Sequence, residues 1–125
     1  MSLETIYLKS DSTFSTTLSD WASNVGVQTE QYDFKSDEIS ADGLLVINEN
    51  QDIEKDVEEI HAFFDKKHFP TQKVDINGTL QVAVTNFEIW MKNFKCKSVL
   101  ILGSDKLVQN ENLARFLERA KKINL

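Results

Sequence analysis

Cysteine, proline and glycine are scarce in this chain of 125 residues, which contains one Cys, one Pro and four Gly. Cys96 has no second cysteine to pair with, so nothing points to an oxidising compartment. With eight Phe and two Trp as well, the composition excludes collagen-like and disordered chains. The longest apolar run, at residues 99–103, is far too short to span a membrane.

Basic residues are outnumbered, with 14 Lys and Arg against 20 Asp and Glu, for a net charge of −6. This balance argues against a general nucleic-acid-binding protein. Residues 1–60 hold 14 acidic and 3 basic side chains, whereas residues 61–125 hold 6 and 11. The asymmetry is typical of solvated helix faces that differ in sign, and a dipolar contact surface is the alternative.

The length fits one domain, residues 1–125, with enough apolar side chains to bury a core. The N-terminal residues have neither the basic region nor the long apolar stretch of a signal peptide. We therefore expect a soluble, cytoplasmic protein.

Short apolar segments alternate with helical patterns along the chain. Strands are expected at residues 5–9, 27–34, 44–47, 73–76 and 98–102. Helices are expected at about residues 14–25, 53–68, 80–94 and 113–122, where apolar side chains recur every three or four positions. Residues 44–47 and 99–102 are apolar throughout, which predicts strands covered on both faces.

This alternation predicts an α/β fold, a three-layer sandwich around a five-stranded, mostly parallel sheet. For five strands in this length we expect the flavodoxin-like order 2-1-3-4-5, with the helix between strands two and three lost or reduced.

In such a sheet, ligands bind beyond the carboxyl ends of the strands. The loops at those ends carry mostly hydroxyl and amide side chains, which can hold a ligand by hydrogen bonds. The candidate ligand-binding residues are Ser10, Ser12, Thr13, Ser15, Asn48, Asn50, Asn77, Thr79 and Ser104. No pairing of a nucleophile with a base is evident among them, so no catalytic residue, cofactor or metal ion is predicted.

Residues 10–17, rich in Ser and Thr, resemble the loop that holds the flavin phosphate in flavodoxins. The resemblance implies an anion site at a helix N-terminus. The loop lacks glycine and contains Asp11, which repels a phosphate, so ordinary helix capping is the alternative.

Residues 75–79 resemble the Asp-x-Asp-Gly-Thr signature of haloacid dehalogenase phosphatases. Asn77 stands where that family has its acid/base Asp, and a carboxamide cannot shuttle a proton. The five-strand pattern is also similar to receiver domains, but Asn48 replaces their phosphoacceptor Asp. We predict no phosphatase activity through Asp75 and no aspartyl phosphorylation at position 48.

The sequence supports two functions, and the absence of a recognisable set of catalytic residues favours the first. One is a non-catalytic interaction or regulatory module that meets a protein partner, with a homodimer through the aromatic helix at residues 80–94 as the expected assembly. The other is a domain that binds a small anionic ligand, such as a phosphate, a flavin or a nucleotide, with the loops at the strand ends.

Overall fold

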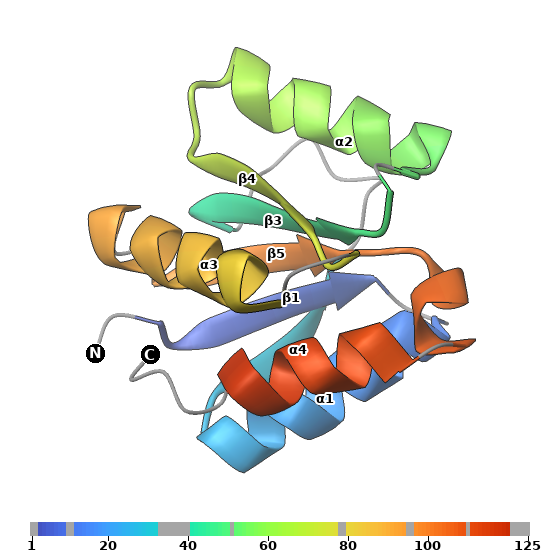
Figure 1. The fold of residues 1–125 in the computed structure, drawn as a ribbon. Helices are drawn as coiled ribbons and strands as arrows, with labels where there is room; N and C mark the ends of the chain where they lie inside the picture. Colours follow the sequence, from blue (N-terminus) through green and yellow to red (C-terminus); the bar gives the residue numbers. More distant parts are fainter. Residues whose placement is uncertain are drawn as a thin grey trace.

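Strands and helices alternate along the chain in the computed structural model (Figure 1). The described residues are 3–9, 12–32, 41–50, 52–77, 80–94, 97–109 and 111–120. The strands are β1 (Thr5–Lys9), β2 (Gln28–Tyr32), β3 (Gly43–Asn48), β4 (Thr71–Asp75) and β5 (Ser98–Leu102). The helices are α1 (Thr13–Val25), α2 (Lys55–Lys66), α3 (Leu80–Phe94), the short 3-10 helix η1 (Asp105–Gln109) and α4 (Glu111–Ala120). Within these described ranges, none is long and apolar enough to cross a membrane.

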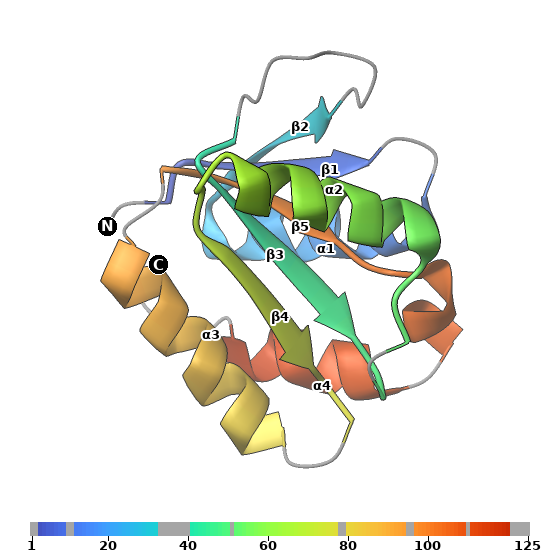
Figure 2. The same ribbon diagram turned by 90° about the horizontal axis from the view of Figure 1, so that it is seen from above.

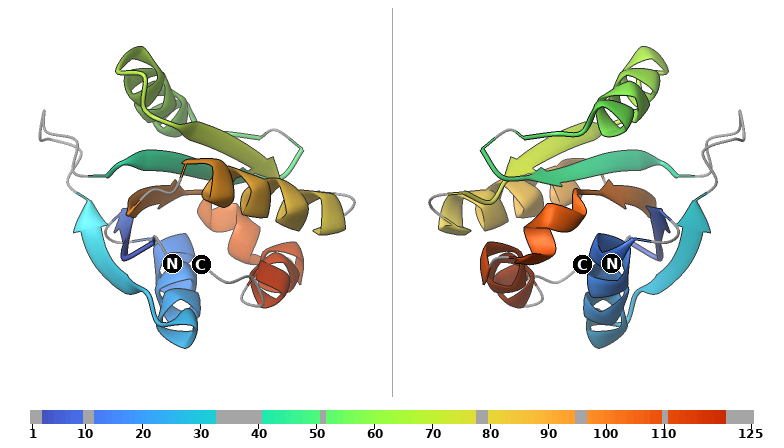
Figure 3. Two further views of the ribbon diagram at one scale, coloured as in Figure 1. Left: turned by 90° about the vertical axis from the view of Figure 1, so that its left-hand side faces the viewer. Right: turned by 90° about the vertical axis from the view of Figure 1, so that its right-hand side faces the viewer.

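The five strands form one sheet in which every neighbouring pair is parallel. Helices α1, α3 and α4 cover one face of the sheet, and α2 covers the other (Figures 2 and 3). The predicted three-layer α/β fold with a five-stranded parallel sheet is therefore confirmed.

The strand order is β2-β1-β5-β3-β4, so the predicted flavodoxin-like order 2-1-3-4-5 is wrong. β5 lies between β1 and β3, and β4 lies at the edge. The reason is the polarity of the strands: β5 is apolar on both faces from Val99 to Leu102, whereas β4 carries Gln72 and Lys73. A central position buries both faces of a strand, which suits β5 and not β4. The reduced second helix was expected between the second and third strands, at residues 35–42, most of which lie outside the described residues.

The two central strands divide the core between the two faces of the sheet. Leu45 and Ile101 belong to the larger apolar cluster, which α1, α3 and α4 complete. Leu44 and Leu100 belong to the smaller cluster, which includes Phe64 of α2. Neighbouring side chains along a strand point to opposite faces of the sheet, and helices cover both faces. Both apolar runs are therefore buried throughout, as the sequence predicts.

Local signals in the sequence fix both ends of α1. Ser12 caps its N-terminus, where the Ser12 hydroxyl accepts a hydrogen bond of 3.3 Å from the backbone N–H of Ser15. Gly26 ends the helix at φ 78°, a left-handed conformation that glycine adopts readily. The indole Nε1 of Trp21 donates to the backbone carbonyl of Leu117 at 2.8 Å, which joins α1 to α4. The start of α1 follows the end of β1 and contacts Asp105 just after β5, so it lies beside the carboxyl ends of both strands.

Candidate ligand-binding site

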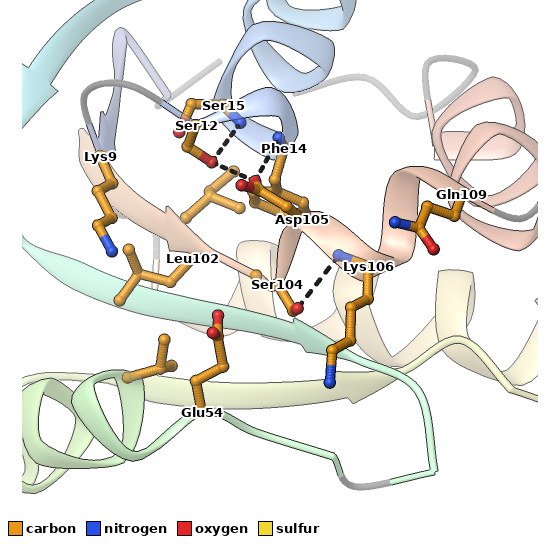
Figure 4. Close-up of a pocket in the computed structure, with 13 residues that line it drawn as sticks. Lys9, Ser12, Phe14, Ser15, Glu54, Leu102, Ser104, Asp105, Lys106 and Gln109 are labelled. Atoms are coloured by element: carbon orange, nitrogen blue, oxygen red, sulfur yellow. Dashed lines mark hydrogen bonds between the residues drawn. The ribbon is translucent and has the colours of Figure 1, made fainter.

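A cavity of about 310 Å³ opens at the carboxyl ends of β1 and β5, and we call it the carboxyl-edge crevice (Figure 4). Near this cavity the chain passes from β1 to α1 on one face of the sheet and from β3 to α2 on the other. Open α/β sheets bind ligands at such a place. Its lining residues are Lys9, Ser12, Phe14, Ser15, Glu54, Val57, Ile101, Leu102, Gly103, Ser104, Asp105, Lys106 and Gln109.

Two lysines supply positive charge to the carboxyl-edge crevice from different elements (Figure 4). Lys9 ends β1, and its Nζ lies 3.2 Å from Asp56 Oδ2 at the start of α2. This ion pair is half-exposed, so it is a weak tie that a ligand can replace. Lys106 lies in η1, and its ammonium makes no ion pair with any residue in the described part of the chain. Lys106 is therefore the cation best placed to meet an anion.

The carboxylate of Asp105 lies against the N-terminus of α1. Its Oδ1 accepts hydrogen bonds from the Ser12 hydroxyl at 2.7 Å and from the backbone N–H of Phe14 at 3.0 Å. The Phe14 N–H first, and then the Ser12 hydroxyl, lower the pKa of Asp105 from its ordinary value. The Ser12 hydroxyl and the Phe14 N–H are thus occupied by the chain's own anion and not by a phosphate.

A second cavity, of about 450 Å³, lies between α1 and β2, and we call it the hydroxyl groove. It shares Lys9, Ser12 and Ser15 with the carboxyl-edge crevice, so the two cavities adjoin. Thr29 of β2 contributes a further hydroxyl, whose Oγ1 lies 3.5 Å from Ser19 Oγ. The described lining residues are Leu8, Lys9, Ser12, Ser15, Thr16, Ser19, Asp20, Thr29, Glu30 and Gln31.

The amides at the ends of β3 and β4 form a separate cluster around Asp75. Asp75 Oδ1 accepts hydrogen bonds from the backbone N–H groups of Asn50, at 3.1 Å, and Asn77, at 2.9 Å. The Asn77 side chain donates to Asn50 Oδ1, and Asn50 adopts φ 60°, which Asn tolerates better than most residues. Asn48 is buried and donates to the carbonyl of Val74 at 3.2 Å. These groups hold two loops together.

The predicted binding residues therefore fall into separate groups. Ser12, Ser15 and Ser104 meet in the carboxyl-edge crevice, where the Ser104 hydroxyl also accepts from the backbone N–H of Lys106 at 3.2 Å. Thr13 starts α1 without lining either cavity that has been described. Asn48, Asn50 and Asn77 lie in the Asp75 cluster. Ser10 and Thr79, like Cys96, lie outside the described residues.

The sequence analysis missed the charged residues of the carboxyl-edge crevice. Lys9, Glu54 and Lys106 all line it, and none was among the candidates. A lysine at the last position of a predicted strand, as Lys9 is, was the available signal. Among the described residues, no group of three or more His, Cys, Asp or Glu is placed to hold a metal ion.

The fold is a doubly wound α/β domain with a cavity at the carboxyl edge of its sheet. No protein-family model matches the sequence. No curated protein matches it significantly either. A solved structure with a similar fold is a crystal structure described as a putative molybdenum carrier protein from Syntrophus aciditrophicus SB. The TM-score is 0.74 over 96% of this chain and 95% of that one, at 12% sequence identity, which shows a shared fold alone.

Proposed function

We propose that this chain is a non-catalytic binding domain for a small anionic molecule, which it holds in the carboxyl-edge crevice. The observation that carries the proposal is the placement of Lys9 and Lys106 at this cavity, above a base that includes Phe14 and Leu102. Glu54 and Asp105 add two carboxylates to the same lining, and that of Asp105 is turned onto the N-terminus of α1. Ser104 adds a hydroxyl beside Lys106. Polar and charged side chains make up most of the lining, which suits a charged ligand held by hydrogen bonds and ion pairs.

Binding fits the crevice better than catalysis does. Ser12 is the one hydroxyl in the described lining that has a carboxylate partner, Asp105, at 2.7 Å. A carboxylate whose pKa is lowered is a weak base, so Asp105 does not activate Ser12 as a nucleophile. The Ser12 hydroxyl is also the cap of α1. The hydrogen bonds of the Ser12 hydroxyl therefore serve the fold and not a reaction.

The similar Syntrophus structure is compatible with this proposal, because it is described as a carrier. A carrier needs a binding site and no catalytic group. Molybdate and phosphate are both tetrahedral oxyanions, and two ammonium groups in a partly enclosed cavity suit either. We therefore include both in the test.

Calorimetric titration at low ionic strength with phosphate, sulfate and molybdate tests the proposal. We expect at least one of them to bind, and Lys106→Gln to weaken that binding about tenfold by removing a charge-assisted contact. Lys92→Gln is the matched control, because Lys92 lies on α3 and pairs with Glu88. No binding by the wild type, or equal weakening in the two variants, would contradict the proposal.

A role as a protein-interaction module is the second candidate, and exposed apolar side chains on α3 favour it. Val82, Ile89 and Phe94 are 57%, 50% and 52% exposed. The aromatic surface from which the homodimer was predicted is smaller than expected, since Phe87 and Trp90 are buried within the chain.

The homodimer remains a prediction that light scattering at micromolar concentration decides. We expect the wild type to have about twice the chain mass of 14.3 kDa. The Ile89→Asp variant should have the mass of a single chain, because a charge buried in the interface opposes association. A mass of 14.3 kDa at low salt and at about 0.5 M salt excludes the homodimer.

A further inference from the structure

We propose that the anionic ligand is a phosphorylated sugar, with its phosphate in the carboxyl-edge crevice and its hydroxyl-bearing part in the hydroxyl groove. This inference rests on the proposed function and extends it by naming the class of ligand. The two cavities adjoin through Lys9, Ser12 and Ser15, so a single molecule can occupy both.

The lining of the hydroxyl groove matches a polyhydroxyl group. Ser and Thr hydroxyls both donate and accept hydrogen bonds, as sugar hydroxyls do. Gln31 adds an amide, and Asp20 adds a carboxylate that accepts from a hydroxyl. Among the described lining residues there is no aromatic ring or Arg on which a nucleobase would stack. The groove therefore favours a sugar over a base.

Ser15 offers a hydroxyl at the junction of the two cavities. Its residue is only 9% exposed, although it lines both cavities. The backbone N–H of Ser15 donates to Ser12 Oγ, but its own hydroxyl forms no hydrogen bond with any of the described residues. This oxygen is accessible at the junction of the two cavities, since Trp90 Nε1 is the one buried side-chain atom without a partner in the described part of the chain. A ligand that crosses from one cavity to the other can form a hydrogen bond with this hydroxyl.

The positions of the two lysines indicate which cavity holds which end of the ligand. Lys106 lines the crevice and not the groove, and Lys9 lies at their junction. The phosphate is therefore placed against Lys106 in the crevice, and the rest of the ligand passes Lys9 at the junction. The sugar then extends past Ser15 toward Thr29, whose hydroxyl faces Ser19 across the groove.

Calorimetric titration with glucose 6-phosphate, ribose 5-phosphate and glycerol 3-phosphate tests the inference, with inorganic phosphate and free glucose as reference probes. We expect at least one phosphate ester to bind about tenfold more tightly than inorganic phosphate, because it adds contacts in the groove. Ser19→Ala combined with Thr29→Val should remove this advantage without changing the affinity for inorganic phosphate. Ser15→Ala should weaken the ester about fivefold.

Thr85→Val is the matched control, because it removes a hydroxyl from the remote helix α3. Near-ultraviolet circular dichroism of each variant establishes that it is folded. If inorganic phosphate binds through Lys106 but no ester binds more tightly, the sugar inference is wrong and the proposed function stands. An ester advantage that survives the double substitution also overturns the inference. If no probe binds, both proposals fail.

Discussion

Gly103→Ala is expected to destabilise the protein by about 1–3 kcal/mol, the usual cost of overpacking a core. Gly103 follows β5 in the carboxyl-edge crevice, where the ring of Phe14 packs directly against its backbone. A methyl group at this position would lie 2.5 Å from Phe14 Cε1 and 2.6 Å from Cζ. Phe14 is 1% exposed, so moving its ring disturbs the packed side chains around it. Urea unfolding measures the effect.

Two further variants separate this contact from a general effect of losing glycine. Gly26→Ala meets no atom within 4 Å, so its cost comes from the left-handed backbone alone and should be about 1 kcal/mol. Phe14→Leu removes the ring that the new methyl group meets. Adding it to Gly103→Ala should cost less than the two single changes predict together. Strict additivity, or a fully stable Gly103→Ala variant, would show that the close approach does not matter.

Asp105→Ala is expected to lower the stability by about 1 kcal/mol, since it removes the acceptor for donors at the N-terminus of α1. The folded-state pKa of Asp105 lies below its ordinary value, so its contribution is fully present above about pH 4. It is lost as the pH falls through the folded-state value. The difference in stability between wild type and variant should therefore be largest near neutral pH and shrink below about pH 4.

Asp105→Asn tests the effect of the same carboxylate on anion binding, which its loss should strengthen. Removing a negative charge beside Lys106 should tighten binding of phosphate or molybdate several-fold, even though the folded state is weakened. Asp65→Asn, on α2 and outside the crevice lining, is the control. A stability difference for Asp105→Ala that persists unchanged at pH 3, or weaker anion binding by Asp105→Asn, would contradict this account.

The sequence predicts the elements of the fold well because their signals are local. Strand β1 and helix α3 have the predicted bounds, and α1 ends at Val25 as expected. Strand order depends on contacts between distant segments, and there the prediction was wrong. The polarity of the strands nevertheless indicates the observed strand order. Lys73 and Gln72 mark an edge, and the run from Val99 to Leu102 requires a central position.

The same error explains what was missed in the candidate site. In the predicted order, β5 is remote from β1, so the loop after β5 has no reason to meet the start of α1. In the observed order these strands are neighbours, which brings Asp105 onto Ser12 across 93 positions of sequence. Lys9 and Lys106 line one cavity for the same reason. Ser12, Ser15 and Ser104 could be predicted because the strand-end rule needs no strand order.

The central claim is that a small anion binds in the carboxyl-edge crevice, and mapping by amide chemical shifts tests it most directly. The ¹⁵N-labelled protein is titrated with phosphate and molybdate at constant ionic strength. The account predicts saturable shifts concentrated in residues 12–15 and 102–109, which surround the crevice, with little change around Asn50 and Asn77. Shifts centred on the Asp75 cluster, or none in residues 12–15 and 102–109 at millimolar anion, would contradict it.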